Sequence, residues 1–208
     1  MFTSQDIIDS INRYLAIVKD PKALQTCFSQ GNYFYYDYKS VANKHSHIHA
    51  YPGIYKDQLY FFMVPEQYDN PQSVDILWEH TQCCLVEGSE KGPVEPGDPG
   101  SHRIPDNVAL ERIIAWEDNY MQWIPEQVNS ENGMFQAFNI STADFESEDD
   151  AIFLGLRQVL GNTTGFVADL IVANNDQAAQ AMVFDDFIKP VPPYGTPALQ
   201  EKFYLLSI

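Results

Sequence analysis

The chain has 208 residues, of which 45% are hydrophobic and 13% aromatic, so it has enough apolar material for a substantial core and is not a largely disordered chain. Its 12 Lys and Arg stand against 29 Asp and Glu, and the formal net charge of −17 argues against direct binding to nucleic acid or to an anionic membrane. No apolar stretch approaches the roughly 18 residues needed to cross a bilayer, and the first residues show no signal region. These features predict a cytoplasmic protein.

The first predicted element is an amphipathic helix. Thr3 and Asp6 have the spacing of a capping box, and Pro21 is expected to end the helix. Between these limits, apolar side chains recur with the helical period, namely Ile7, Ile8, Ile11, Leu15 and Val18. Because this stripe is one-sided, the helix is expected to lie against the body of the protein.

An aromatic, strand-favouring region follows the helix. A short segment near residues 24–28 leads through a Gln-Gly-Asn turn into extended stretches, which we place at residues 33–38, 45–55, 59–64 and 74–86. Their connections are too short for crossovers, which favours an antiparallel meander.

Residues 88–105 interrupt this pattern with four glycines and four prolines in eighteen residues, which excludes a helix or a central strand. The segment could link two domains. We favour a long surface loop within a single domain spanning residues 1–208, because neither flanking part can cover its apolar faces alone.

The second half combines one clear helix with further strands. The helix is predicted to be capped by Asp106 and to end at Pro125. The apolar run 151–160 follows several acids, which suits the start of a helix, although a strand is an alternative. Strands are expected at residues 134–140, 166–173, 181–187 and 203–208, with an extended segment at 189–194. The chain as a whole is therefore predicted to be α+β, with an antiparallel sheet of meanders and hairpins and two or more amphipathic helices packed on it.

One cluster has the composition of a metal site. In an extended strand, His45, His47 and His49 project from one face, where imidazoles can bind one divalent transition metal, with further ligands from Glu79, His80 or the cysteines. The alternative is a solvated strand face that carries histidines by chance. The sequence contains no nucleophile elbow, no phosphate-binding loop and no dinucleotide fingerprint.

The acidic residues are unevenly distributed. Thirteen acids and a single base, Arg157, lie between Ile113 and Ile188, whereas residues 1–56 hold four acids and six bases. This excess can serve solubility, or it can bind a basic protein. Tyrosines gather in the first half, and tyrosine is enriched at protein interfaces. The residues predicted to bind a partner are Tyr35, Tyr36, Tyr38, Glu146, Asp149 and Asp150.

These patterns favour a non-enzymatic interaction protein whose acidic surface binds a basic protein partner, as immunity and adaptor proteins do. The alternative is a small metal-binding protein or metal-dependent enzyme that uses the histidine strand. The sequence neither favours nor excludes a third class, an assembly component.

Overall fold

The computed structural model describes residues 2–38, 47–88, 103–145, 150–159, 164–176, 181–185, 188–191 and 202–208. Helices and antiparallel strands occupy these ranges, which confirms the predicted α+β class. The α-helices are α1 (Ser4–Ile17), α2 (Pro21–Phe28), α3 (Val74–Leu77) and α4 (Asp106–Val128). The strands are β1 (Tyr33–Tyr36), β2 (His47–Tyr55), β3 (Gln58–Pro65), β4 (Gln82–Leu85), β5 (Arg103–Ile104), β6 (Ala137–Ser141), β7 (Asp150–Gln158), β8 (Phe166–Asp176), β9 (Ala181–Asp185) and β10 (Ile188–Val191).

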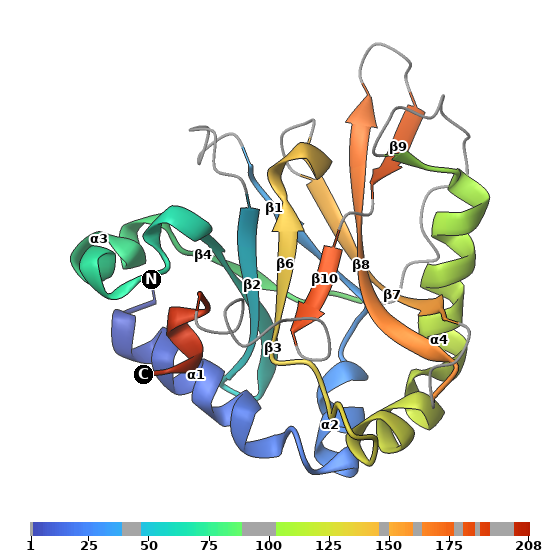
Figure 1. Ribbon diagram of the computed structural model, residues 1–208, viewed down its shortest axis with the longest axis horizontal. Coiled ribbons are helices and arrows are strands. Elements are labelled where there is room, and N and C mark those ends of the chain that lie inside the picture. Colours follow the sequence, from blue (N-terminus) through green and yellow to red (C-terminus); the bar gives the residue numbers. More distant parts are fainter. Residues whose placement is uncertain are drawn as a thin grey trace.

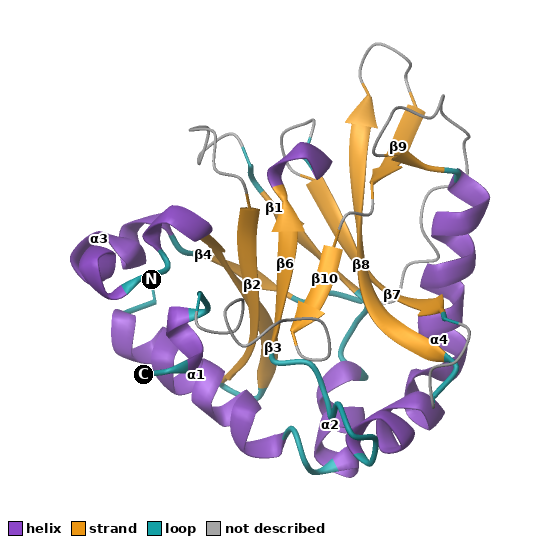
Figure 2. Ribbon diagram, viewed as in Figure 1, coloured by secondary structure: helices purple, strands orange, loops and turns teal. Residues whose placement is uncertain are grey.

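The strands form two antiparallel sheets instead of one. Sheet A has the order β1-β7-β8-β9-β5, and sheet B has the order β10-β6-β2-β3-β4. In Figure 1, α4 runs along one side of the strands, while α1 and the C-terminal segment lie on the other. Figure 2 shows the same arrangement as helices flanking a central block of strands. The described residues therefore stack in four layers: α4, sheet A, sheet B, and α1 with the C-terminal segment.

Three apolar clusters hold these layers together. The largest fills the space between the sheets, where Phe34 of sheet A stacks on Phe61 of sheet B with ring centroids 4.5 Å apart. A second lies outside sheet B, where Ile11 of α1 packs with Phe62. A third lies outside sheet A, where Ile113 of α4 packs with the strands. Because neighbouring residues of a strand face opposite ways, Phe61 and Phe62 enter different clusters.

The first helix is capped as its sequence indicates. The Thr3 hydroxyl accepts from the Asp6 N–H, and the Asp6 carboxylate accepts from the Thr3 N–H, which completes a capping box. Pro21 does more than follow this helix, because it lies in the first turn of α2, whose N-cap Asp20 accepts from two backbone N–H groups. The segment near residues 24–28, assigned to the strand-rich region, is therefore helical.

Helix α1 approaches sheet B closely at Gly53. A Cβ at this position would lie 2.5 Å from Cε2 of Phe62 and 3.0 Å from backbone atoms of Ser10 and Ile11. The absence of a side chain is what lets the helix backbone rest on β2 here.

Two other apolar segments need correction: residues 74–86 were predicted to be one strand, and residues 151–160 were left open between a helix and a strand. Residues 74–86 begin as α3 and a 3-10 turn, and only Gln82–Leu85 is a strand. Asn70 starts the preceding helical turn by accepting from the N–H groups of Gln72 and Ser73. The described part of the apolar run 151–160 forms a strand, β7 (Asp150–Gln158), and not a helix. This strand is buried on both faces between β1 and β8, so its sequence shows no alternation.

Helix α4 differs from its prediction at both ends. Its N-cap is Pro105 without a side-chain hydrogen bond, and Asp106 is already helical. It continues through Pro125 to Val128, although proline cannot donate to the carbonyl of Met121. That carbonyl instead accepts from Nε2 of Gln25 in α2 at 2.5 Å, which satisfies the group that the proline leaves open.

The last residues form a 3-10 turn, Tyr204–Leu206, and not the predicted strand. Most of the predicted loop 88–105 lies outside the described residues, so the single-domain organisation stays a prediction. Within the described residues, no helix combines the length and the apolar character needed to span a membrane.

Candidate functional site

The histidine strand presents its polar side chains on the outer face of sheet B. His47, His49 and Tyr51 alternate along β2, with Ile48 and Ala50 turned toward the core between the sheets. The predicted placement of His47 and His49 on one face agrees with this arrangement, while His45 lies outside the described residues.

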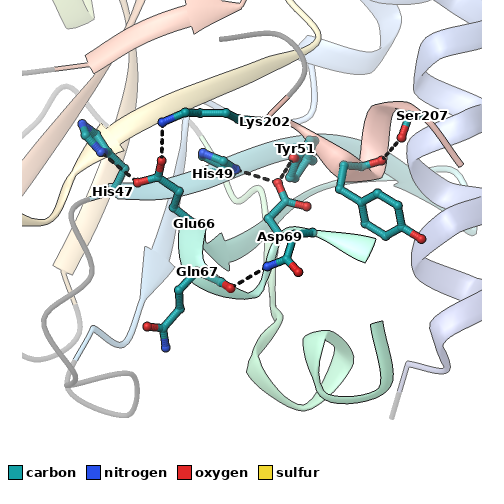
Figure 3. Close-up of polar contacts among 10 residues, drawn as sticks. His47, His49, Tyr51, Glu66, Gln67, Asp69, Lys202 and Ser207 are labelled. Carbon is teal, nitrogen blue, oxygen red and sulfur yellow. Dashed lines mark hydrogen bonds and ion pairs between the residues drawn. The ribbon is translucent and has the colours of Figure 1, made fainter. Parts of the chain in front are cut away.

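Asp69 joins two of these side chains. Its Oδ2 accepts from Nδ1 of His49 at 2.6 Å and from the Tyr51 hydroxyl (Figure 3). Asp69 follows the 3-10 turn Glu66–Tyr68, which continues directly from β3, the neighbour of β2. All three side chains are buried, and burial together with the Asp69 charge raises the pKa of Tyr51 well above its usual range.

The C-terminal segment covers this cluster. The ring of Phe203 stacks on the imidazole of His49 with centroids 4.1 Å apart. Lys202 pairs with Glu66 at 3.0 Å, and Glu66 also accepts from Nδ1 of His47 at 3.2 Å. Nε2 of His49 is buried and has no hydrogen-bond partner in the part of the chain that the structure describes. Asp69 therefore fixes Nδ1 of His49, while Nε2 of the same ring is buried with no partner among the described residues.

The other predicted metal ligands do not join the histidines. The His80 ring instead stacks on Tyr68 at 3.8 Å, and Cys84 is buried in the core between the sheets. Among the described residues, no three His, Cys, Asp or Glu side chains are grouped closely enough to hold a metal ion.

A second candidate surface is the outer side of α4. Its acidic side chains Glu111, Asp118 and Glu126 are exposed, and between them Ile114 and Met121 are 43% and 50% exposed. We call these five residues the α4 face. Their spacing places them on one side of the helix.

The basic residue of α4 is turned away from this face. Nη1 of Arg112 donates to Oδ2 of Asp169 in β8 at 2.9 Å, and the Asp169 side chain is fully buried. The positive charge is therefore neutralised inside, and the α4 face itself carries only acidic charge.

The residues predicted to bind a partner occupy different environments. Tyr35 is 50% exposed, whereas Tyr36 and Asp150 are buried in sheet A. Tyr38 is half-buried, with its ring stacked on Phe145. Glu146 and Asp149 lie outside the described residues. A buried side chain offers no surface to a partner, which excludes Tyr36 and Asp150, and of the two remaining tyrosines Tyr35 is the more exposed.

Two features of the sites were not expected from sequence. Asp69 lies 20 residues from His49, and no local spacing connects them. The exposure of Ile114 and Met121 could have been found from sequence, because both fall between acids on the polar side of a helical pattern.

Comparison with known proteins gave no match, whether to a protein-family model, to a curated protein or to a solved structure.

Proposed function

We propose that this chain is a non-catalytic binding protein whose α4 face docks a basic protein partner. The observation that carries the proposal is the combination of exposed apolar side chains and exposed acids on one helix surface. Ile114 and Met121 supply apolar contact area, and the flanking carboxylates supply charge that a basic partner complements. An immunity-type or adaptor protein that binds a basic partner would fit this surface.

The exposed Tyr35 adds apolar surface on the same side of the molecule as the α4 face. Tyr33 and Tyr35 point to one face of β1, and Tyr33 packs in the cluster that lies under α4. Tyr35 therefore also faces the side of sheet A that α4 covers. Among the described residues, five large apolar side chains are exposed, and three of them, those of Tyr35, Ile114 and Met121, lie on this side.

The test is co-purification from the native cell at low and high salt, with partners identified by mass spectrometry. The double variant Asp118→Lys/Glu126→Lys reverses the charge of the α4 face, and Asp75→Lys/Glu79→Lys makes the same change at exposed acids elsewhere. We expect a basic protein to be retained by the wild type and the control, lost by the α4 variant and weakened by salt. Equal retention by both variants would contradict the proposal.

A transition-metal site on the histidine strand is the second candidate. The observation that favours it is that Nδ1 of both His47 and His49 lies against a carboxylate. Metal-binding histidines are commonly oriented in this way, so that Nε2 faces the metal. Binding through His49 requires Phe203 to move aside, because its ring covers the imidazole.

Metal content distinguishes this candidate. The purified, untagged protein is analysed by mass spectrometry for Zn, Fe and Mn, beside the variants His47→Ala and His80→Ala. The candidate predicts near-stoichiometric metal that is lost with His47 and kept in the His80 variant. Metal-free wild-type protein after incubation with Zn²⁺ would exclude the site.

A further inference from the structure

A cavity of about 330 Å³ lies between α4 and sheet A. Val108, Glu111 and Arg112 of α4 form one wall, and Arg157, Gln158 and Phe166 of the strands form the other. The volume is at the lower end of the range for small-molecule sites, about 300–1,000 Å³. The cavity is separate from the histidine cluster, which lies on the opposite side of the two sheets.

Gly155 of β7 lets Arg112 of α4 come close to sheet A. This glycine lies between Phe153 and Arg157 on the face of β7 that α4 covers, and its partner in β8 is Asp169. A Cβ at Gly155 would lie 3.5 Å from Cβ of Arg112. The missing side chain leaves space for Arg112 to reach Asp169, so this guanidinium is held in place and its charge is neutralised.

Arg157 is not neutralised in this way. Its Nε is buried and has no hydrogen-bond partner, and no described residue forms an ion pair with it. Nε itself is closed to the cavity, but the other guanidinium N–H groups of this cavity-lining side chain also make no hydrogen bond to a described residue, so an oxyanion in the cavity can accept from them. The planar guanidinium matches a carboxylate, to which it can donate two parallel hydrogen bonds.

We infer that this cavity binds a small monocarboxylate with an apolar body. The carboxylate accepts from Arg157, and the apolar part contacts Val108 and Phe166. A single negative charge fits the site better than the double charge of a phosphate, because Glu111 also lines the cavity and Arg112 is already paired with Asp169. The site differs in its ligand from the α4 face proposed above, which takes a basic protein.

The test is calorimetric titration of the full chain with phenylacetate, phenyl phosphate and phenethylamine, which share a ring and differ in charge. We expect saturable binding of phenylacetate, weaker binding of phenyl phosphate and none of the amine. Arg157→Gln should weaken phenylacetate binding at least tenfold, and Arg157→Lys should weaken it less. Lys22→Gln, which removes an exposed charge from α2, should leave it unchanged.

A second measurement keeps the inference testable if the Arg157 variants do not fold. Amide chemical shifts of the wild-type protein should change on phenylacetate addition in residues 108–115 and 156–158, and not around His49. Failure of phenylacetate to bind, tighter binding of phenyl phosphate, or shifts confined to other regions would each overturn the inference. The α4 face shares Glu111 with the cavity, but the charge reversals that test the α4 face are at Asp118 and Glu126, which do not line it, so the two proposals can fail independently.

Discussion

The outer faces of the two sheets are covered in similar ways but differ in how they enclose polar groups. On sheet B, α1 rests on β2 at Gly53, and on sheet A, α4 crosses β7 at Gly155. The His49–Asp69 pair on sheet B is then sealed by the C-terminal segment. On sheet A, Arg157 of β7 and Arg112 of α4 instead line a cavity whose wall includes the exposed Glu111. We therefore expect the face of sheet B to govern stability and that of sheet A to govern binding.

Removal of the buried carboxylates should give the largest difference between the two faces. Asp69→Ala leaves the Nδ1–H of His49 and the hydroxyl of Tyr51 buried without an acceptor, at a cost of about 1–3 kcal/mol each. Asp169→Ala should cost less, because the Arg112 side chain is 16% exposed and can bind water in the cavity. The free energy of unfolding in urea measures both. A larger loss for Asp169→Ala would contradict the distinction between a sealed and an open face.

Replacing Gly53 or Gly155 by alanine compares the two faces with a smaller chemical change. Gly53→Ala places a methyl group 2.5 Å from the Phe62 ring and 3.0 Å from the α1 backbone, so it should lower the free energy of unfolding by about 1–3 kcal/mol. Gly155→Ala meets Cδ1 of Ile171 at 3.0 Å, and the end of this side chain can move, so its effect should be smaller. Thermal unfolding of the two variants tests this order. A lower melting temperature for Gly155→Ala than for Gly53→Ala would contradict it.

The pH dependence of stability should come from the core that both faces share. Burial raises the pKa of the Cys27 thiol from 9.0 to about 12. Between these values the folded state keeps a proton that the unfolded state loses, so stability present below pH 9 declines as the pH rises toward 12. Cys27→Ala should reduce the slope of unfolding free energy against pH by about 1.4 kcal/mol per pH unit within this interval. Urea unfolding at several alkaline pH values measures it, and an unchanged slope would show that Cys27 does not titrate as proposed.

Much of the fold follows from local sequence, and the failures have physical causes. The hairpin of β8 and β9 was predicted from the turn residues Asn174, Asn175 and Asp176 between two apolar segments. His47 and His49 were predicted to share a face because residues two apart in a strand point the same way. Strand β7 lost this signal because both of its faces are buried. The continuation of α4 past Pro125 depends on Gln25, far away in the chain, which no local pattern shows.

The candidate sites were less predictable, because their polar partners meet only in the folded chain. Arg112 and Asp169 are 57 residues apart, and neither belongs to a motif. Asp150 was predicted to be a surface acid since it ends an acidic run, yet it is the first residue of β7 and is fully buried. Charge counted along a sequence does not distinguish an exposed carboxylate from a buried one.

The strand order has a consequence for how the protein is made. Sheet A pairs β1, near the start of the chain, with β7, and sheet B pairs β2 with β6. At translation rates of about 5–20 residues per second, β1 leaves the ribosome on the order of ten seconds before β7 exists. During that time β1 and β2 each present an edge whose partner, β7 or β6, has not yet been made, and unpaired edges favour aggregation. We therefore expect protection of these edges by a chaperone to raise the yield of folded protein until the late strands have been synthesised.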